Sequence, residues 1–169
     1  SNIIYKIPNR LAEGYGPNLR IMNEMLKENV KLLFTLDCGT SAFNTIDHEN
    51  YKDIDVIVID HHLSEYKLPK VFSIVNPNRF DENTNYKDLA AVGVTFLFLM
   101  ALRKLMRDNN LFTKIKEPNL MSYLDLVAVG TICDIVNITH YNRSIVKKGL
   151  ELIIQRRNKS ISSIIDNTK

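Results

Sequence analysis

The sequence has little of several features that would define a class of protein at once. It holds two cysteines, Cys38 and Cys133, which are too few for a disulfide framework and favour a reducing, cytoplasmic location. No apolar run approaches the roughly 20 residues that cross a membrane as a helix. No low-complexity tract, fixed-period repeat or linker rich in Gly, Ser or Pro interrupts the chain. These absences exclude a disulfide scaffold, a membrane span and a repeat array.

An excess of charge of one sign is also absent. The chain has 22 Lys and Arg against 19 Asp and Glu, a formal net charge of +3. Such a small excess is compatible with a polyanionic partner without requiring one. What the chain does have is apolar residues: 45% of its 169 residues are hydrophobic, enough to bury one sizeable core.

Residues 3–76 alternate short apolar segments with helical patterns. We predict strands at Ile3–Ile7, Lys31–Leu36, Ile54–Ile59 and Phe72–Val75, and helices at residues 19–29 and Ser41–Tyr51. Strands that are apolar on every residue suit a sheet covered on both faces, and intervening helices favour parallel pairing. The sequence therefore predicts an α/β fold, with a mainly parallel sheet flanked by helices in three layers.

The second part of the chain, residues 88–165, is predicted to be helical. We expect helices at Asp88–Met106, Leu120–Ile135, Asn142–Gln155 and Ser160–Ile165. The first of them is apolar almost all round, which indicates a buried helix.

Polar side chains follow two of the predicted strands. Asp37 ends the second apolar run, and Asp60, His61 and His62 end the third. Ligands of open parallel sheets bind outside the carboxyl ends of the strands. The two strand ends lie about 5 Å apart if the strands are neighbours, or about 10 Å apart if one strand lies between them. A lone Asp there usually caps a turn, but an Asp-His-His run is harder to explain structurally. Carboxylate and imidazole together predict a site for manganese, magnesium, iron or zinc.

The triplet Asp60-His61-His62 resembles the signature of the DHH phosphoesterases. Segments from about Tyr5 to Val136 match the RecJ type of that family in order and rough spacing: IPNRLAEGYG, LDCGTSA, VIDHH, AAVGVTFLF and LDLVAVGTICDIV. The resemblance implies a divalent-metal-dependent exonuclease that removes nucleotides from the 5′ end of single-stranded DNA. It also implies two Mn²⁺ or Mg²⁺ ions in the whole enzyme, which share the attacking water.

The same resemblance implies roles for individual residues. Asp37 matches the carboxylate that bridges the two cations, and His61 looks like a metal ligand. His62 matches the histidine that faces the substrate phosphate, and Asp60 would orient a histidine ring through its N–H. Asp134 matches a fourth motif and would complete the coordination of one cation.

Three assignments keep an open alternative. Asp125 and Asp134 fall on opposite faces of a continuous helix, so at most one enters the site, and only the resemblance selects Asp134. Arg10 could clamp a phosphate or be an ordinary surface arginine. Gly93 could let backbone N–H groups approach a phosphate, or could allow close helix–sheet packing.

Other polar residues are expected to be structural. The two cysteines are interpreted as small buried hydrophobes, and Asp53 and Asp55 precede a strand at the wrong edge of the sheet. His48 and His140 are expected to be exposed. The basic C-terminal part is expected to be a solvated helix face, with nucleic-acid contact as the alternative: Lys147, Lys148, Arg156, Arg157 and Lys159.

Active members of that family begin with a further strand that ends in a His/Asp-x-Asp set of ligands, and end with a second domain. We therefore interpret residues 1–169 as a partial DHH catalytic domain, truncated at its N-terminal strand. Alone, it is expected to bind at most one cation weakly, to be inactive, and to self-associate through an exposed sheet edge. The alternatives are an oligoribonuclease, a cyclic-dinucleotide phosphodiesterase or a pyrophosphatase of the same superfamily, or a non-catalytic binding module.

Overall fold

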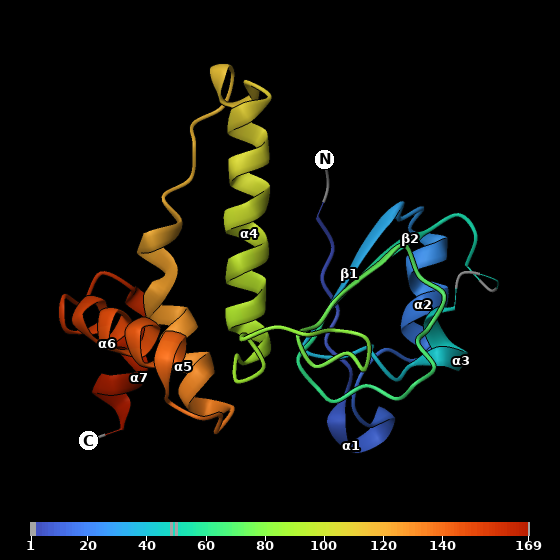
Figure 1. Ribbon diagram of the computed structural model, residues 1–169, viewed down its shortest axis with the longest axis horizontal. Coiled ribbons are helices and arrows are strands. Elements are labelled where there is room, and N and C mark those ends of the chain that lie inside the picture. Colours follow the sequence, from blue (N-terminus) through green and yellow to red (C-terminus); the bar gives the residue numbers. More distant parts are fainter. Residues whose placement is uncertain (1–2, 48, 50, 169) are drawn as a thin grey trace. The chain divides into compact units, whose positions relative to one another are not determined.

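The computed structural model describes residues 3–47, 49 and 51–168 of the chain. The chain divides into two compact units, Ser1–Thr84 and Asn85–Lys169 (Figure 1). The division falls between the part predicted to alternate strands with helices and the part predicted to be helical. The interpretation of the whole chain as one partial catalytic domain stays a prediction.

A parallel sheet forms the centre of the first unit. Its elements in chain order are α1 (Arg10–Glu13), α2 (Leu19–Lys27), β1 (Leu32–Leu36), α3 (Phe43–Ile46), β2 (Asp55–Ile59) and β3 (Ser73–Val75). The strands pair in the order β1-β2-β3, with both pairs parallel. All three carboxyl ends therefore lie along one side of the sheet, which we call its carboxyl edge. Strands β1 and β3 are the outer strands of this sheet, and self-association through an outer strand stays a prediction.

Helix α2 covers one face of this sheet. Asn18 caps its N-terminus by accepting a hydrogen bond from the N–H of Ile21 at 2.9 Å. One stripe of the helix is buried, and it packs with Val56 and Val58 of β2 in a common core: Ile21, Met22 and Met25. This burial holds the sheet as a rigid base for the side chains at its edge.

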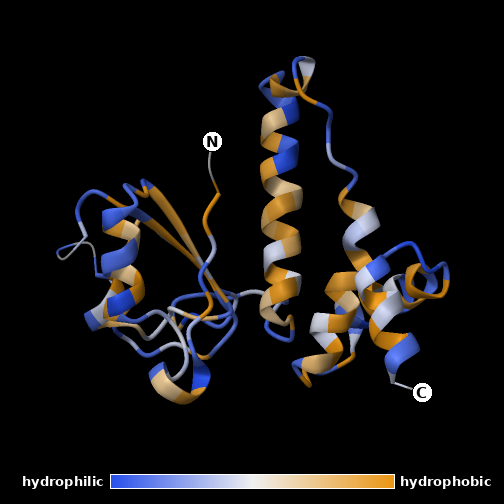
Figure 2. Ribbon diagram, turned by 180° about the vertical axis from the view of Figure 1, so that it is seen from behind, coloured by the Kyte–Doolittle hydropathy of each residue, from blue (hydrophilic) through white to orange (hydrophobic). Residues whose placement is uncertain are grey.

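The apolar runs of the strands divide between the two sheet faces. In Figure 2 both β1 and β2 are coloured mainly as hydrophobic. On one face of β1, Leu33 packs against the core and Thr35 is buried. On the other face the side chains are exposed: Leu32, Phe34 and Leu36. Strand β2 is more deeply buried than β1, as expected for the central strand of three.

Two of the predicted elements in the first unit are wrong. Ile3–Ile7 is not a strand. A β-branched segment forms a strand only where a neighbouring strand offers backbone hydrogen bonds. The side chains of Ile3, Tyr5 and Ile7 are exposed. The helix predicted at Ser41–Tyr51 is reduced to α3. Helix α3 ends at Ile46, and the backbone of the next residue, Asp47, is extended. Aspartate has a low helix propensity. His48, predicted to be exposed in that helix, lies outside the described residues.

The second unit is helical, as predicted. Its elements are α4 (Ala91–Asp108), the 3₁₀ turns η1 (Leu111–Thr113) and η2 (Leu120–Tyr123), then α5 (Leu124–Cys133), α6 (His140–Ile154) and α7 (Lys159–Asn167). Helix α4 is the longest and runs upright in Figure 1. None of the helices within the described residues combines the length and the apolar character needed to span a membrane.

A close helix crossing joins α5 and α6. A Cβ added to Gly149 would lie 2.2 Å from the Cβ of Ala128 and 2.4 Å from the carbonyl oxygen of Leu124. The crossing therefore requires glycine at this position. The core of the unit is built around buried apolar side chains of α4, η2 and α5: Phe96, Leu120, Leu124 and Val127.

The turn after α5 stores backbone strain. Ile135 has φ +56°, in the left-handed region that β-branched residues avoid, and its side chain is 91% exposed. We expect Ile135→Asn to raise the free energy of unfolding by about 1 kcal/mol, because Asn tolerates this conformation and no packing is lost. Chemical denaturation measures the change.

The matched control is Ile138→Asn, the same substitution at a neighbouring, partly exposed position without a positive φ. It should bring no gain in stability. An equal gain from both variants would mean that surface hydrophobicity, and not backbone strain, is responsible.

Candidate metal centre

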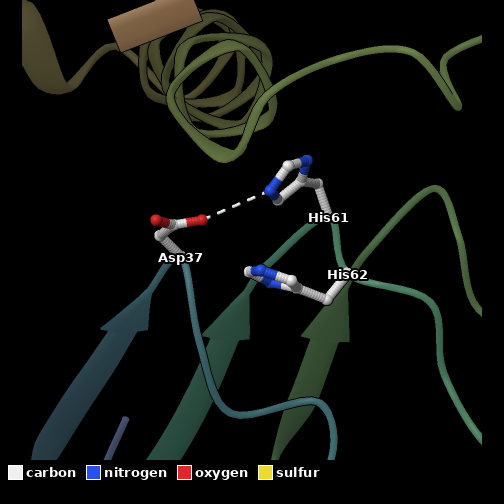
Figure 3. Close-up of side chains that lie close together, drawn as sticks. All are labelled: Asp37, His61 and His62. Carbon is white, nitrogen blue, oxygen red and sulfur yellow. Dashed lines mark ion pairs between the residues drawn. The ribbon is translucent and has the colours of Figure 1, made fainter. Parts of the chain in front are cut away.

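Three ligand-capable side chains converge at the carboxyl edge of the sheet. Asp37 follows β1, and His61 and His62 follow β2, as Figure 3 shows. One ligand atom from each residue lies within 4.8 Å of the other two. The Oδ1 of Asp37 is 3.4 Å from the Nε2 of His61. The spacing that was predicted from neighbouring strand ends is thus realised by Asp37, His61 and His62.

The turn after β1 points the Asp37 carboxylate into this group. The N–H of Asp37 continues the strand pairing by donating to the carbonyl of Ile59 at 2.9 Å, and its φ of +61° then turns the chain. Aspartate tolerates this left-handed conformation. The Asp37 side chain is 52% exposed and that of His61 13%, so a largely buried imidazole meets a solvent-accessible carboxylate.

Asp60 is the buried anchor of the site. It is 2% exposed, and it accepts hydrogen bonds from the backbone N–H groups of Thr40 (3.1 Å), His61 (2.8 Å) and His62 (3.3 Å). Its Oδ1 also lies 2.7 Å from Nδ1 of His62. Burial by itself would raise the pKa of Asp60, but the hydrogen bonds from His62, Thr40 and His61 together hold it below its usual value.

The contact with Asp60 shows which ring nitrogen of His62 carries a proton. A carboxylate only accepts hydrogen bonds, so Nδ1 of His62 must carry the proton that it donates to Asp60. When the ring is neutral, Nε2 is left with the free lone pair. This is the contact that the predicted orienting role of Asp60 requires, and that role stays a prediction.

Two asparagines that the sequence analysis did not select also hold the histidines. The side-chain amide of Asn76 donates to the carbonyl oxygen of His62 at 2.9 Å, and that of Asn78 donates to the carbonyl oxygen of His61 at 2.7 Å. The signal was present, since Asn76-Pro77-Asn78 follows β3 at the same edge.

Arg10 and Tyr15 lie beside the histidine pair. The rings of Tyr15 and His62 meet edge-to-face with centroids 5.7 Å apart, and the guanidinium of Arg10 lies 5.0 Å from the Tyr15 centroid. Burial, followed by the charge of Asp37, raises the pKa of Tyr15, so its hydroxyl stays protonated. Tyr15 was not predicted as a site residue, although it belongs to the EGYG segment that carried part of the resemblance.

The donor set fits a divalent cation. Ligands about 2.1 Å from one ion lie about 3.0–3.4 Å from each other in octahedral or tetrahedral geometry. The distance of 3.4 Å between Asp37 and His61 agrees with this, and the ligand atoms of all three residues lie within 4.8 Å of one another. One carboxylate with two imidazoles suits Mn²⁺, Fe²⁺ or Zn²⁺ better than Mg²⁺, which prefers oxygen ligands.

The remaining predicted site residues belong to the second unit. Asp134 is exposed and ends α5 as its C-cap. Asp125 is buried in the first turn of α5, where it accepts from the N–H of Leu126 at 2.7 Å. Gly93 is buried in α4, and its N–H donates to the carbonyl of Ala90 at 2.8 Å. The metal role of Asp134 and the phosphate role of Gly93 stay predictions.

The cysteines differ from each other. Cys38 is half-buried, and burial followed by the charges of Asp60 and Asp37 raises the pKa of its thiol to about 11. Cys133 is exposed, so its interpretation as a buried hydrophobe is wrong. Its position at the end of α5 gives it no core to enter.

Comparison with known proteins agrees with this geometry. The family profile described as "DHH family, N-terminal domain" matches residues 1–131. The chain belongs to the DHH family. The triplet Asp60-His61-His62 is therefore the DHH triplet, and the predicted family resemblance is confirmed.

Curated relatives within the DHH family include single-stranded-DNA-specific exonucleases named RecJ. The chain is 39% identical to that of Haemophilus influenzae, with 92% of this chain and 27% of the relative covered. It is 40% identical to that of Escherichia coli, with 90% and 27% covered. The chain thus spans about a quarter of the length of the curated relatives it matches.

Solved structures confirm the DHH fold class. A crystal structure of exonuclease RecJ bound to manganese is similar with a TM-score of 0.70 and 34% identity, covering 88% of this chain and 35% of that chain. RecJ of Thermus thermophilus in complex with Mn²⁺ is similar with a TM-score of 0.61 and 32% identity, covering 80% and 19%. The prediction of a parallel sheet flanked by helices is confirmed.

Proposed function

We propose that this chain is part of a divalent-metal-dependent exonuclease of RecJ type that hydrolyses single-stranded DNA from its 5′ end. The observation that carries the proposal is the convergence of Asp37, His61 and His62 at the carboxyl edge of the sheet. It is supported by the similarity to RecJ exonucleases and to RecJ structures that contain manganese.

Each residue of the group has a distinct task. Asp37 and His61 hold the cation, and Asp134 is proposed to complete its coordination. A bound divalent cation, Mn²⁺ by preference, supplies positive charge for the phosphate oxygens and a water of lowered pKa. Asp60 accepts the proton of His62 Nδ1, which leaves Nε2 facing outward, and a proton on Nε2 lets His62 donate a hydrogen bond to the phosphate of the substrate.

Arg10 is proposed to bind a phosphate of the DNA strand. Its guanidinium lies over the Tyr15 ring, which itself contacts His62, so the cation is held beside the histidine pair. Within the described residues Arg10 forms no ion pair with a carboxylate. Its planar fork of donors therefore suits a phosphate, which it can bind through two parallel hydrogen bonds.

The test is a chimera of the Escherichia coli RecJ, in which the matching segment is replaced by this chain. The chimera should hydrolyse 5′-labelled single-stranded DNA in the presence of Mn²⁺, whereas the 169-residue chain alone should not. Asp37→Asn in the chimera should lower the rate by at least about 100-fold, because a ligand contributes more than the outer-shell groups whose loss costs 10–100-fold.

Two comparisons make the assay specific. Asp53→Asn removes an exposed carboxylate at the opposite end of β2 and should leave the rate unchanged. Double-stranded DNA, short oligoribonucleotides, cyclic dinucleotides and pyrophosphate serve as competing substrates. A folded chimera that binds single-stranded DNA without hydrolysing it, or that prefers one of these substrates, would contradict the proposal.

A further inference from the structure

A closed circuit of hydrogen bonds joins the ends of all three strands behind the candidate metal centre. The N–H of Thr40, after β1, donates to Oδ2 of Asp60 at 3.1 Å. The amide of Asn76, after β3, donates to Oγ1 of Thr40 and to the carbonyl of His62, both at 2.9 Å. Nδ1 of His62 closes the circuit to Oδ1 of Asp60 at 2.7 Å.

Asn76, which follows β3, is the member of this circuit that reaches the ends of both other strands. Both N–H bonds of its amide are used, and its Oδ1 accepts from the N–H of Asn78 at 2.8 Å. Asn78 in turn donates to the carbonyl of His61 at 2.7 Å. The backbone carbonyls of both histidines are therefore held, directly or through one neighbour, by this single amide.

Burial makes these contacts selective for asparagine. Asn76 is 4% exposed, and Thr40 and Asp60 are buried with it, so water does not substitute freely for a lost partner. Aspartate in the same place would only accept hydrogen bonds and would face the His62 carbonyl without a proton. The turn after β3 uses only the Oδ1 of Asn76, which accepts from the Asn78 N–H, whereas both amide donors go to Thr40 and His62.

We propose that Asn76 is a positioning residue of the metal centre. It fixes the backbone of His61 and His62 against the Asp37–Thr40 turn, and so sets the distance between the carboxylate and the imidazoles. The inference rests on the proposed metal-dependent function of this site. It adds a residue that touches neither metal nor substrate, and that acts through Thr40 and the two histidine carbonyls.

The experiment compares Asn76→Leu with the unchanged 169-residue chain. Leucine keeps the side-chain volume, is uncharged, and removes both donors. Hydrogen exchange followed by NMR in metal-free buffer should show the N–H groups of Thr40, His61 and His62 exchanging at least tenfold faster, with the N–H groups of α2 unchanged. Titration with Mn²⁺ should show an affinity lowered about 10–100-fold, the range for groups that orient metal ligands.

Asn18→Ala is the matched control, because it removes an asparagine of the same unit whose contacts are confined to α2 and Glu13. It should leave Mn²⁺ affinity and exchange at the histidines within about twofold of the unchanged chain. Thr40→Val and Thr40→Ser provide a second pair should Asn76→Leu not fold. Serine keeps the hydroxyl and should retain the affinity, whereas valine should lose it.

The hydrogen-exchange measurement and the Mn²⁺ titration together separate this proposal from the proposed function. Unchanged exchange at His61 and His62 in Asn76→Leu, or a loss of Mn²⁺ affinity no greater than in Asn18→Ala, would overturn the positioning role. If the unchanged chain binds no Mn²⁺ but exchange accelerates as expected, the positioning of the histidines stands and the metal-dependent function is what fails.

Discussion

Asp37→Asn is expected to weaken Mn²⁺ binding by the 169-residue chain about 100-fold, which isothermal titration calorimetry would measure. Asp37 is the only carboxylate in the group of ligand atoms found among the described residues, and it is accessible to solvent. The amide keeps the shape of the side chain but removes the negative charge that offsets the charge of the cation. Binding that survives through the remaining ligands would be far weaker.

The control for Asp37→Asn is Asp53→Asn. Asp53 precedes β2 and is exposed at the amino edge of the same sheet. It therefore offers the same carboxylate group at the end of the sheet opposite the candidate metal centre. It should leave Mn²⁺ affinity unchanged. Equal losses in both variants would show that Mn²⁺ binds the chain through its general charge and not through the predicted site.

Gly39→Ala is expected to lower the free energy of unfolding by about 4 kcal/mol and to displace Asp37. Two costs add at this position. The φ of Gly39 is +113°, a conformation that L residues rarely adopt, and an added Cβ would lie 2.6 Å from Oγ1 of Thr35 and 3.3 Å from both methyls of Val58. Both neighbours are buried in the sheet, so they cannot move aside easily.

Gly14→Ala separates these two costs. Gly14 also has a positive φ, +79°, but a Cβ there would meet nothing within 4 Å. The variant should lose only the conformational part, about 2 kcal/mol, in the same denaturation experiment. A loss in Gly39→Ala no larger than in Gly14→Ala would mean that the turn after β1 yields to the added methyl group.

The structure also divides the DHH triplet into two kinds of residue. Asp60 is buried, and its carboxylate accepts hydrogen bonds from the N–H groups of Thr40, His61 and His62, which are the contacts that its predicted orienting role requires. His61 and His62 carry the ring nitrogens that lie near Asp37. A conservative change at Asp60 should therefore disturb geometry first, and a change at His61 should disturb ligation first.

Much of this site could be predicted because parallel strands place their carboxyl ends side by side. Asp37 and the Asp60–His62 run are each adjacent to a strongly apolar run, so local pattern alone located them. Thr40, Asn76 and Tyr15 could not be selected in the same way. Each lies in a loop with ordinary turn composition, and each acquires its partner from a segment distant in the chain.

The sequence by itself determined the periodic elements and the acids and imidazoles that end them, because hydrophobic periodicity and strand-end chemistry are local properties. Only the tertiary structure decided which segments pair. Ile3–Ile7 has the composition of a strand but gains no strand neighbour, whereas β3, with three residues, pairs with β2. The hydrogen bonds of Asn76 likewise depend on three strand ends meeting at one edge, and no single segment encodes that meeting.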